Sequence, residues 1–302
     1  MPKYSFPRNV WRALYPILIY IGMSLLVGII AAAGYAAAAI IRSGMTMDTE
    51  AAVSTVQEFI EQYVLWIQMG VSAICIIFFI PMWVKTKKTM PKQNGAKMGP
   101  ISLLLTVLGC LCMNLILACV IDITKVDLLF PSYEQISNTL VSGSLLVQIL
   151  AVGLFAPIVE ELICRGVVLN RLNFWMPAWL AVFFSSVLFG VMHLNMFQGL
   201  YAFLIGVVFA MLYLRFRNLA AAIVGHMAFN LANIALREIF ELLGIMEPNS
   251  FVILVPSAIL SIFAFVMLIK ITKTPKAQIK APAEESKQEP GPVSIAIEDS
   301  KS

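Results

Sequence analysis

Six polar side chains within long apolar segments are the residues of this sequence that could do chemistry. They are two adjacent glutamates, an arginine, the only two histidines of the chain and an asparagine: Glu160, Glu161, Arg165, His193, His226 and Asn230. An ionisable side chain inside a bilayer costs about 2.5–3.5 kcal/mol on insertion scales, so such a residue generally serves a function. A carboxylate with two imidazoles and an amide is a set of groups suited to hydrolysis.

The two glutamates are expected to differ in role. Glu161 and Arg165 are four residues apart, so on a helix they share a face and can form an ion pair that lowers the cost of both charges. Glu160 lies about 100° further around the helix and is left free to act. Pro157, one turn earlier, removes a backbone donor and can kink the helix or open it to water. The alternative is that both carboxylates pair with Arg165 and only hold helices together.

The two histidines lie on two further apolar segments. His226, Asn230 and Asn233 follow one another at helical spacing and form a polar stripe, which we expect to face the bundle interior because lipid contact would be costly. A glutamate or histidine can take a proton from water, and an imidazole with an amide can donate to a developing oxyanion. Hydrogen bonding between helices is the alternative for His193 and for the stripe.

The same side chains include a potential zinc set. Glu160, His193 and His226 are ligand types that zinc accepts, and an open site would leave room for water. No cysteine or third histidine completes the set, since the five cysteines fit buried apolar thiols better. We therefore favour a mechanism without a metal or other cofactor and keep zinc as the alternative. The sequence has no H-E-x-x-H, G-x-S-G or G-x-G-D, which disfavours the zinc site-2, rhomboid and aspartyl classes of intramembrane protease.

The composition is that of a polytopic membrane protein. Of 302 residues, 60% are hydrophobic and 13% are charged, and the mean hydropathy is +0.87. The net charge of +4 is small and the basic residues cluster at segment ends, which argues against a nucleic-acid partner. We expect an all-α bundle of about eight transmembrane helices, near residues 12–40, 62–84, 101–121, 140–164, 177–195, 199–216, 218–237 and 251–270.

Charges at the segment ends predict the orientation. Every second loop is basic and the loops between are mostly acidic, so the positive-inside rule puts both termini in the cytoplasm. We expect a multi-pass protein of a bacterial cytoplasmic membrane. The predicted division of the chain is N-terminal helices (about three) and loops at 1–139, a catalytic core at 140–240, a last transmembrane helix at 241–272 and a disordered cytoplasmic tail at 273–302.

Three short motifs carry a resemblance to a known family. E-E-x-x-x-R begins at Glu160, F-x-x-x-H at Phe189 and H-x-x-x-N at His226, in this order and each on its own apolar segment. Together they closely resemble the CPBP family, which groups type II CAAX prenyl endopeptidases with bacteriocin-processing and immunity (Abi-like) membrane proteins. The resemblance covers roughly residues 140–240.

The resemblance implies an eight-helix membrane fold with an intramembrane endopeptidase site. The family is often called a metalloprotease family, although its glutamate-based mechanism needs no metal. The motifs imply roles for six residues: Glu160 and His193 would activate the attacking water, His226 and Asn230 would bind the oxyanion, and Glu161 and Arg165 would pair and position the site.

The predicted substrate is a membrane-associated protein or peptide. Maturation of a small peptide or processing of another membrane protein is favoured over CAAX processing. One rival is a non-catalytic immunity or membrane scaffold protein, in which the polar residues bind helices or a partner. Another is a proton-coupled transporter with Glu160 and the histidines as a relay, although the sequence shows no internal repeat of the kind that such proteins have.

Overall fold

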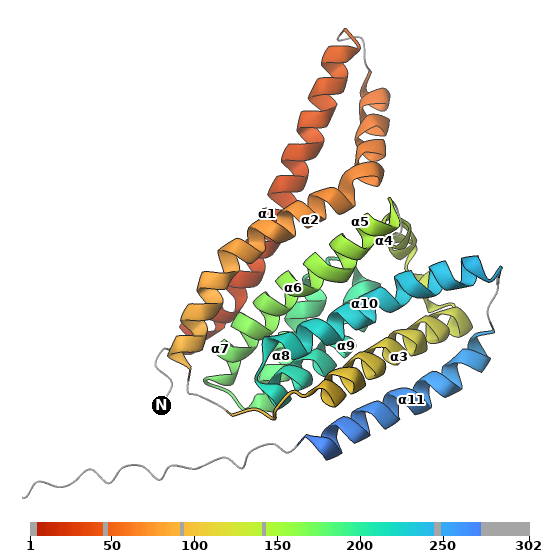
Figure 1. Ribbon diagram of the computed structural model, residues 1–302. Helices are drawn as coiled ribbons and strands as arrows, with labels where there is room; N and C mark the ends of the chain where they lie inside the picture. Colours follow the sequence, from red (N-terminus) through yellow and green to blue (C-terminus); the bar gives the residue numbers. More distant parts are fainter. Residues whose placement is uncertain (1–4, 45–47, 91–93, 141–142, 245–248, 273–302) are drawn as a thin grey trace, which may run out of the picture.

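A computed structural model of the chain describes residues 5–44, 48–90, 94–140, 143–244 and 249–272. All regular secondary structure in these ranges is helical (Figure 1). The predicted tail at 273–302 lies outside the described residues. The helices and helical turns follow in the order α1 (Phe6–Arg42), α2 (Thr49–Thr89), α3 (Pro100–Thr124), η1 (Val126–Leu129), α4 (Pro131–Leu140), α5 (Leu145–Gln148), η2 (Ile149–Phe155), α6 (Ala156–Glu161), η3 (Leu162–Leu169), α7 (Asn170–Asn173), α8 (Ala178–Val191), α9 (Met196–Phe216), α10 (Leu219–Leu242) and α11 (Ser250–Ile271).

Seven of the described helices are long and apolar enough to cross a membrane, so the chain is a multi-pass, all-helical membrane protein. About eight spans were predicted, and the described residues hold these seven together with one shorter apolar helix, Ala178–Val191. The segment predicted at 177–195 forms α8, which has only 14 residues and rises about 21 Å. That is less than the roughly 30 Å of a bilayer's hydrocarbon core. Helix α8 is short because the chain turns back immediately after it, as described below.

A central rod spans Leu145–Asn173 and is the most buried of the candidate spans. It contacts α1, α2, α8, α9 and α10, so it lies inside the bundle. Two stretches of π-helical turns, η2 and η3, flank the α-helical segment α6, where Pro157 is near the first turn and has no N–H to donate. Wide π turns often occur at functional sites because they re-aim side chains and backbone groups.

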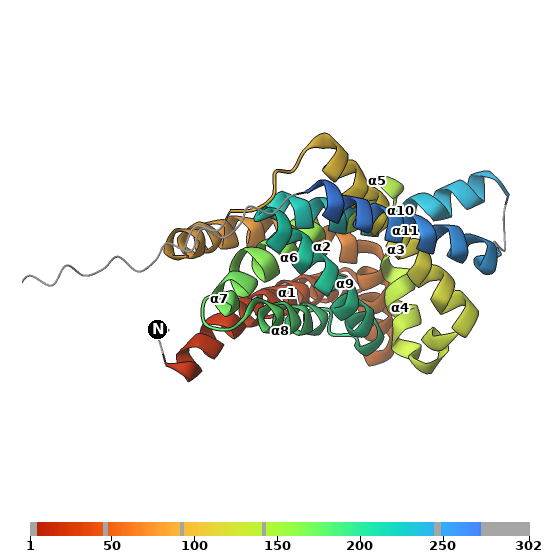
Figure 2. The ribbon, with the colours of Figure 1, turned by 90° about the horizontal axis from the view of Figure 1, so that it is seen from below.

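Helix α3 lies between α10 and α11 (Figure 1). Seen from below, these three helices are on one side of the bundle, whereas α1 and α8 are on the other (Figure 2). Helices α3 and α10 run in the same direction, and they approach closely at Gly225 of α10. A Cβ atom at this glycine would lie 3.1 Å from Cys110 Sγ of α3. Gly225 of α10 and Cys110 of α3 therefore lie at about the same level along the two helices.

Helices α8 and α9 form a tight hairpin. A Cβ atom at Gly190 would lie 2.5 Å from the Gly199 carbonyl oxygen, so only glycine fits at this crossing. The connection turns at Leu194, which has a left-handed backbone with φ of 53°. Asn195 then caps α9, and its side chain accepts a hydrogen bond from the Gln198 N–H. The hairpin therefore ends α8 just before His193.

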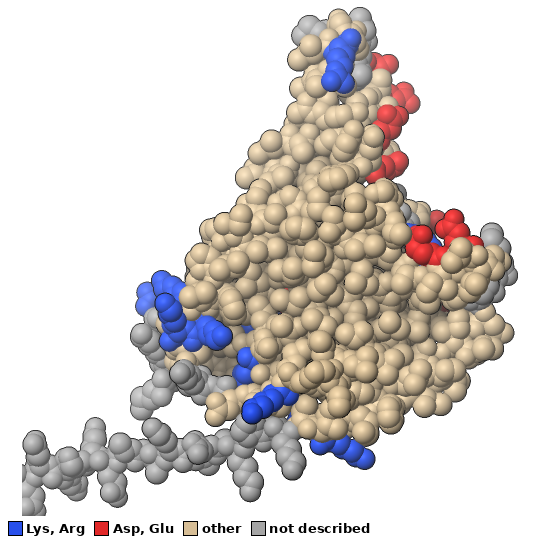
Figure 3. Space-filling model, viewed as in Figure 1, with Lys and Arg blue, Asp and Glu red and all other residues tan. Residues whose placement is uncertain are grey.

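Charged side chains separate to opposite ends of the molecule (Figure 3). Most acidic residues lie at the upper right of the view and most basic residues along its lower edge. The wide tan surface between them is uncharged. This distribution is the one expected of a bundle that crosses a membrane between the two charged zones.

Candidate active site

Glu161 and Arg165 form an ion pair inside the bundle. The two side chains are fully buried, and Arg165 Nη1 donates to Glu161 Oε1 at 2.8 Å, as the four-residue spacing predicted. The Arg165 guanidinium also donates to the Gly206 carbonyl of α9 at 2.6 Å and lies over the Phe189 ring, 4.5 Å from its centroid. The pair thus ties the central rod to α8 and α9.

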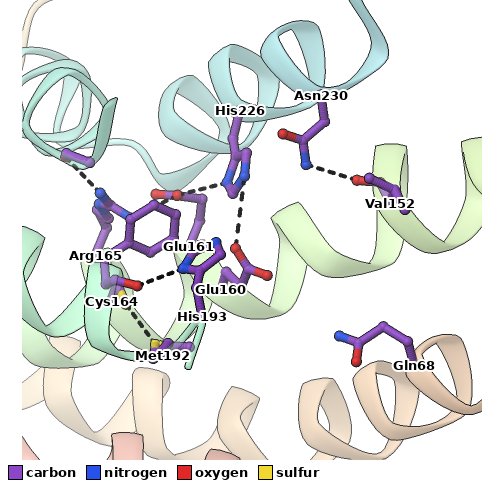
Figure 4. A network of polar contacts seen from close by, with 12 residues as sticks. Gln68, Val152, Glu160, Glu161, Cys164, Arg165, Met192, His193, His226 and Asn230 are labelled. Carbon is purple, nitrogen blue, oxygen red and sulfur yellow. Dashed lines mark hydrogen bonds and ion pairs between the residues drawn. The ribbon is translucent and has the colours of Figure 1, made fainter. Parts of the chain in front are cut away.

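His226 is oriented by the same carboxylate. Its Nδ1 lies 3.0 Å from Glu161 Oε1, and because a carboxylate accepts, Nδ1 carries the proton of this hydrogen bond. Its ring stacks on Phe209, with centroids 4.6 Å apart. The other nitrogen, Nε2, lies 3.8 Å from Glu160 Oε2, which is longer than a hydrogen bond (Figure 4).

The ring of His226 lies close to both glutamates. The sequence argument grouped His226 with Asn230 and predicted no contact between His226 and either glutamate. The structure instead aims its ring between Glu160 and Glu161, because both carboxylates stand on the rod beside α10. Glu161 therefore has two partners, Arg165 and His226, where the spacing indicated only the first.

His193 follows the end of α8, where the helix has just stopped. Its Nδ1 lies 2.9 Å from the Phe189 carbonyl oxygen, four residues earlier. A carbonyl can only accept, so Nδ1 bears the hydrogen and Nε2 is left as an acceptor in the neutral ring. An unprotonated Nε2 is the form that can take a proton from water. The F-x-x-x-H spacing has this physical meaning: the Phe189 carbonyl fixes the tautomer of His193.

The side chain of Asn230 is hydrogen-bonded to the central rod. Its Nδ2 donates to the Val152 carbonyl at 2.9 Å, and Val152 lies in the π-helical stretch η2 (Figure 4). An amide NH₂ has two hydrogens, so this bond uses one and fixes the direction of the other. The second N–H of Asn230 remains available to a bound group.

One cavity of about 750 Å³ brings the four predicted catalytic residues together. Glu160, His193, His226 and Asn230 all line it, and so does Asn233 of the predicted stripe. Glu161 and Arg165 are not among the residues that line it. The volume is within the range of ordinary ligand pockets, roughly 300–1,000 Å³.

The cavity reaches the surface on the acidic side of the bundle. Its other charged lining residues are Asp122, Lys125, Asp127 and Arg237, all near the ends of helices that finish among acidic residues. Tyr133 of α4 also lines the cavity at this end. Burial raises the pKa of the Tyr133 phenol above its ordinary value, so the hydroxyl keeps its proton at neutral pH and can donate.

Zinc, the alternative to a metal-free site, would be held by Glu160, His193 and His226. The described residues include no group of three or more His, Cys, Asp or Glu side chains placed to hold a metal ion. The His226 Nε2 and Glu160 Oε2 atoms lie 3.8 Å apart, whereas two ligands about 2.0–2.1 Å from one tetrahedral zinc would lie about 3.4 Å apart.

The sequence analysis did not identify several groups that line the cavity or bond to its residues. Tyr20 and Gln68 line the cavity, and Gln68 Nε2 donates to the Tyr20 hydroxyl at 3.2 Å. Asn114 lines it from α3. Gln68 and Asn114 are polar residues within apolar segments, the same signal that singled out the histidines. The backbone acceptors at Val152 and Gly206 have no side-chain signal, because they follow from helix packing.

Part of the chain matches a known protein family. Residues 142–232 match the family model of the type II CAAX prenyl endopeptidase Rce1-like proteins. The match supports CPBP family membership. It covers the central rod, α8, α9 and the first half of α10, which carry all three motifs. No curated protein and no solved structure gives a significant match to the chain. At the family level, the chain is thus similar to CAAX-type intramembrane proteases.

Proposed function

We propose that this protein is an intramembrane endopeptidase that hydrolyses a peptide bond of a membrane-associated protein or peptide. The observation that carries the proposal is the convergence of Glu160, His193, His226 and Asn230 on one cavity. These residues come from the central rod, the α8–α9 turn and α10. They lie far apart in the sequence, and the packing of the helices brings them together. The family match supports the same class of reaction.

In the proposed reaction, the attacking water binds between Glu160 and His193. Glu160, or His193 through its unprotonated Nε2, takes one proton from the water as its oxygen bonds to the scissile carbonyl carbon. The carbonyl oxygen becomes an oxyanion. The C–N bond then breaks, and the proton held by the base passes to the leaving nitrogen. No metal is assigned a step.

The oxyanion is proposed to be bound by His226 and Asn230. With Nδ1–H donated to Glu161, a second proton on His226 Nε2 makes the ring a cation that can donate into the cavity. The Glu161 carboxylate stabilises that cation, and Arg165 holds the carboxylate. The free N–H of Asn230 supplies the second donor.

We also propose that both termini are cytoplasmic and that the membrane is a bacterial cytoplasmic membrane. The support is the separation of basic and acidic residues, because basic loops remain on the cytoplasmic side. In this orientation the cavity opens away from the cytoplasm, among Asp122, Lys125 and Asp127. A substrate would then present its cleavage site from the outer side.

A comparison of membrane proteins in two strains tests the proposed function. One strain carries the wild-type protein and the other carries Glu160→Ala at the same expression level. We expect at least one membrane-associated protein or peptide to accumulate uncleaved in the variant strain, with its shorter product found only with the wild type. Identical cleavage products in both strains would contradict the proposal.

A further inference from the structure

Asn114 of α3 is a buried polar residue without a partner. Its side chain is about 1% exposed, and neither its Oδ1 nor its Nδ2 has a hydrogen-bond partner in the described part of the chain. Leaving such a group unpaired is unfavourable, so buried amides are nearly always bonded to something. The residue also lines the cavity that holds Glu160.

Asn114 is part of a wall that leads from the surface to the site. Cavity-lining residues recur along α3 at helical spacing: Asn114, Leu117, Ala118, Ile121, Asp122 and Lys125. Asp122 and Lys125 are exposed and pair with each other at 2.7 Å. Between them and Asn114 the wall is apolar. Asn114 is therefore the first buried hydrogen-bonding side chain that an entering group meets on this helix.

The depth of Asn114 matches that of Asn230. Cys110 of α3 lies against Gly225 of α10, and the two helices run in the same direction. Asn114 is four residues beyond Cys110, and Asn230 is five beyond Gly225. With a rise of 1.5 Å per residue, the two amides lie within about 2 Å of the same level.

We propose that Asn114 binds the backbone of the substrate, at a peptide group next to the one that is cleaved. A carboxamide offers one acceptor and two donor hydrogens, which complement the N–H and C=O of a peptide group. The contact is independent of side-chain identity. The proposal rests on the proposed function, and it adds a substrate-binding residue on a helix outside the residues 142–232 that match the family.

Cysteine accessibility tests the binding contact without requiring cleavage. Asn114→Cys is made in a Glu160→Gln background, and its reaction with a water-soluble methanethiosulfonate is timed with and without a mixture of short synthetic peptides of randomised sequence. The five native cysteines are buried. Ser72→Cys is the matched control, because Ser72 is equally buried but does not line the cavity.

We expect Asn114→Cys to react, the peptide mixture to slow that reaction several-fold, and Ser72→Cys to stay unreactive. A cysteine at this position that does not react, or that reacts at the same rate with peptide present, would overturn the proposal. Protection by peptides together with no cleavage by the wild-type protein would instead count against the proposed function alone.

Kinetics separate substrate binding from a structural role. With a peptide that the wild type cleaves, Asn114→Leu should raise KM roughly 5- to 100-fold and largely keep kcat, since a uniform binding contact is lost. The same variant should be at least as heat-stable as wild type in detergent, because it removes an unpaired buried amide. Ser72→Ala should leave KM unchanged. Loss of heat stability with an unchanged KM would show that Asn114 only holds helices together.

Discussion

At the scale of single residues, the Glu161 carboxylate links the buried charges. Its Oε1 accepts from both Arg165 and His226, whereas its Oε2 has no partner among the described residues. Two donors compensate one buried negative charge, so the three side chains depend on one another. The sequence predicted the Arg165 contact from spacing alone, but the His226 contact depends on how α10 packs on the rod.

Removal of Arg165 should therefore destabilise the protein. We expect Arg165→Ala to cost about 3–5 kcal/mol, because it leaves the Glu161 carboxylate with too little compensation in a buried site. Thermal unfolding in detergent measures this. Adding Glu161→Gln should recover part of the loss. Lys125→Ala is the control, since Lys125 pairs with Asp122 at the surface and such pairs contribute about 1 kcal/mol or less. Equal melting of Arg165→Ala and wild type would refute the ion-pair argument.

Zinc content is a second residue-scale prediction. Because Glu160 with His193 supplies a base and no cysteine or third histidine completes a zinc set, we expect the purified, active protein to carry well under one zinc per chain and to keep its activity after prolonged chelation. Elemental analysis and a cleavage assay measure the two quantities. Stoichiometric zinc, with activity lost to a chelator and restored by zinc, would make Glu160 and the histidines ligands.

At the scale of elements, the α8–α9 hairpin positions His193. The sequence predicted two full spans here, because both segments are apolar and nothing in their composition indicates a turn inside the bundle. The structure ends α8 after 14 residues, at a crossing where Gly190 and Gly199 touch backbone to backbone. The end of α8 leaves the Phe189 carbonyl free to hold the His193 ring.

Substitution at this crossing should disturb the site. Gly190→Ala would place a methyl group 2.5 Å from the Gly199 carbonyl oxygen, so we expect a loss of roughly 1–3 kcal/mol and of most activity as His193 moves. Gly22→Ala on α1 is the matched control, because a Cβ atom there meets nothing within 4 Å. It should be neutral in both the melting and the cleavage assays. An active, stable Gly190→Ala protein would show that the hairpin does not set the position of His193.

Some features of these elements could be predicted from the sequence, and others could not. Helical spacing was enough to predict the Glu161–Arg165 pair and the single face of His226 and Asn230. It could not predict the π-helical stretches, since their widened turns have no residue signature. It also missed Asn114, because one asparagine in an apolar helix means little until packing shows that it faces the same cavity as Glu160.

At the scale of the whole molecule, the separation of charges and the position of the cavity together define a direction of access. The charged residues that line the cavity near the surface belong to the acidic side. None of the basic residues at the opposite end lines it in the described part of the chain. A substrate that reaches Glu160 by this route enters from the side opposite to the basic residues.

Single-cysteine labelling of intact cells measures this orientation. We expect Asp127→Cys to react with a membrane-impermeant maleimide added outside the cells, and Lys88→Cys to react only after the membrane is opened. The native cysteines are buried and should give little background. Labelling of Lys88→Cys from outside, with Asp127→Cys protected, would reverse the orientation and put the cavity opening in the cytoplasm.

The most direct test of the central claim is the cleavage rate of purified Glu160→Gln on a natural substrate. The substitution keeps the shape of the side chain and removes its basicity, so the protein should melt as the wild type does. Loss of one general base should lower the rate by about 10²–10⁴. A Glu160→Gln protein that cleaves the substrate at the wild-type rate would contradict the assignment of Glu160 as the group that activates water.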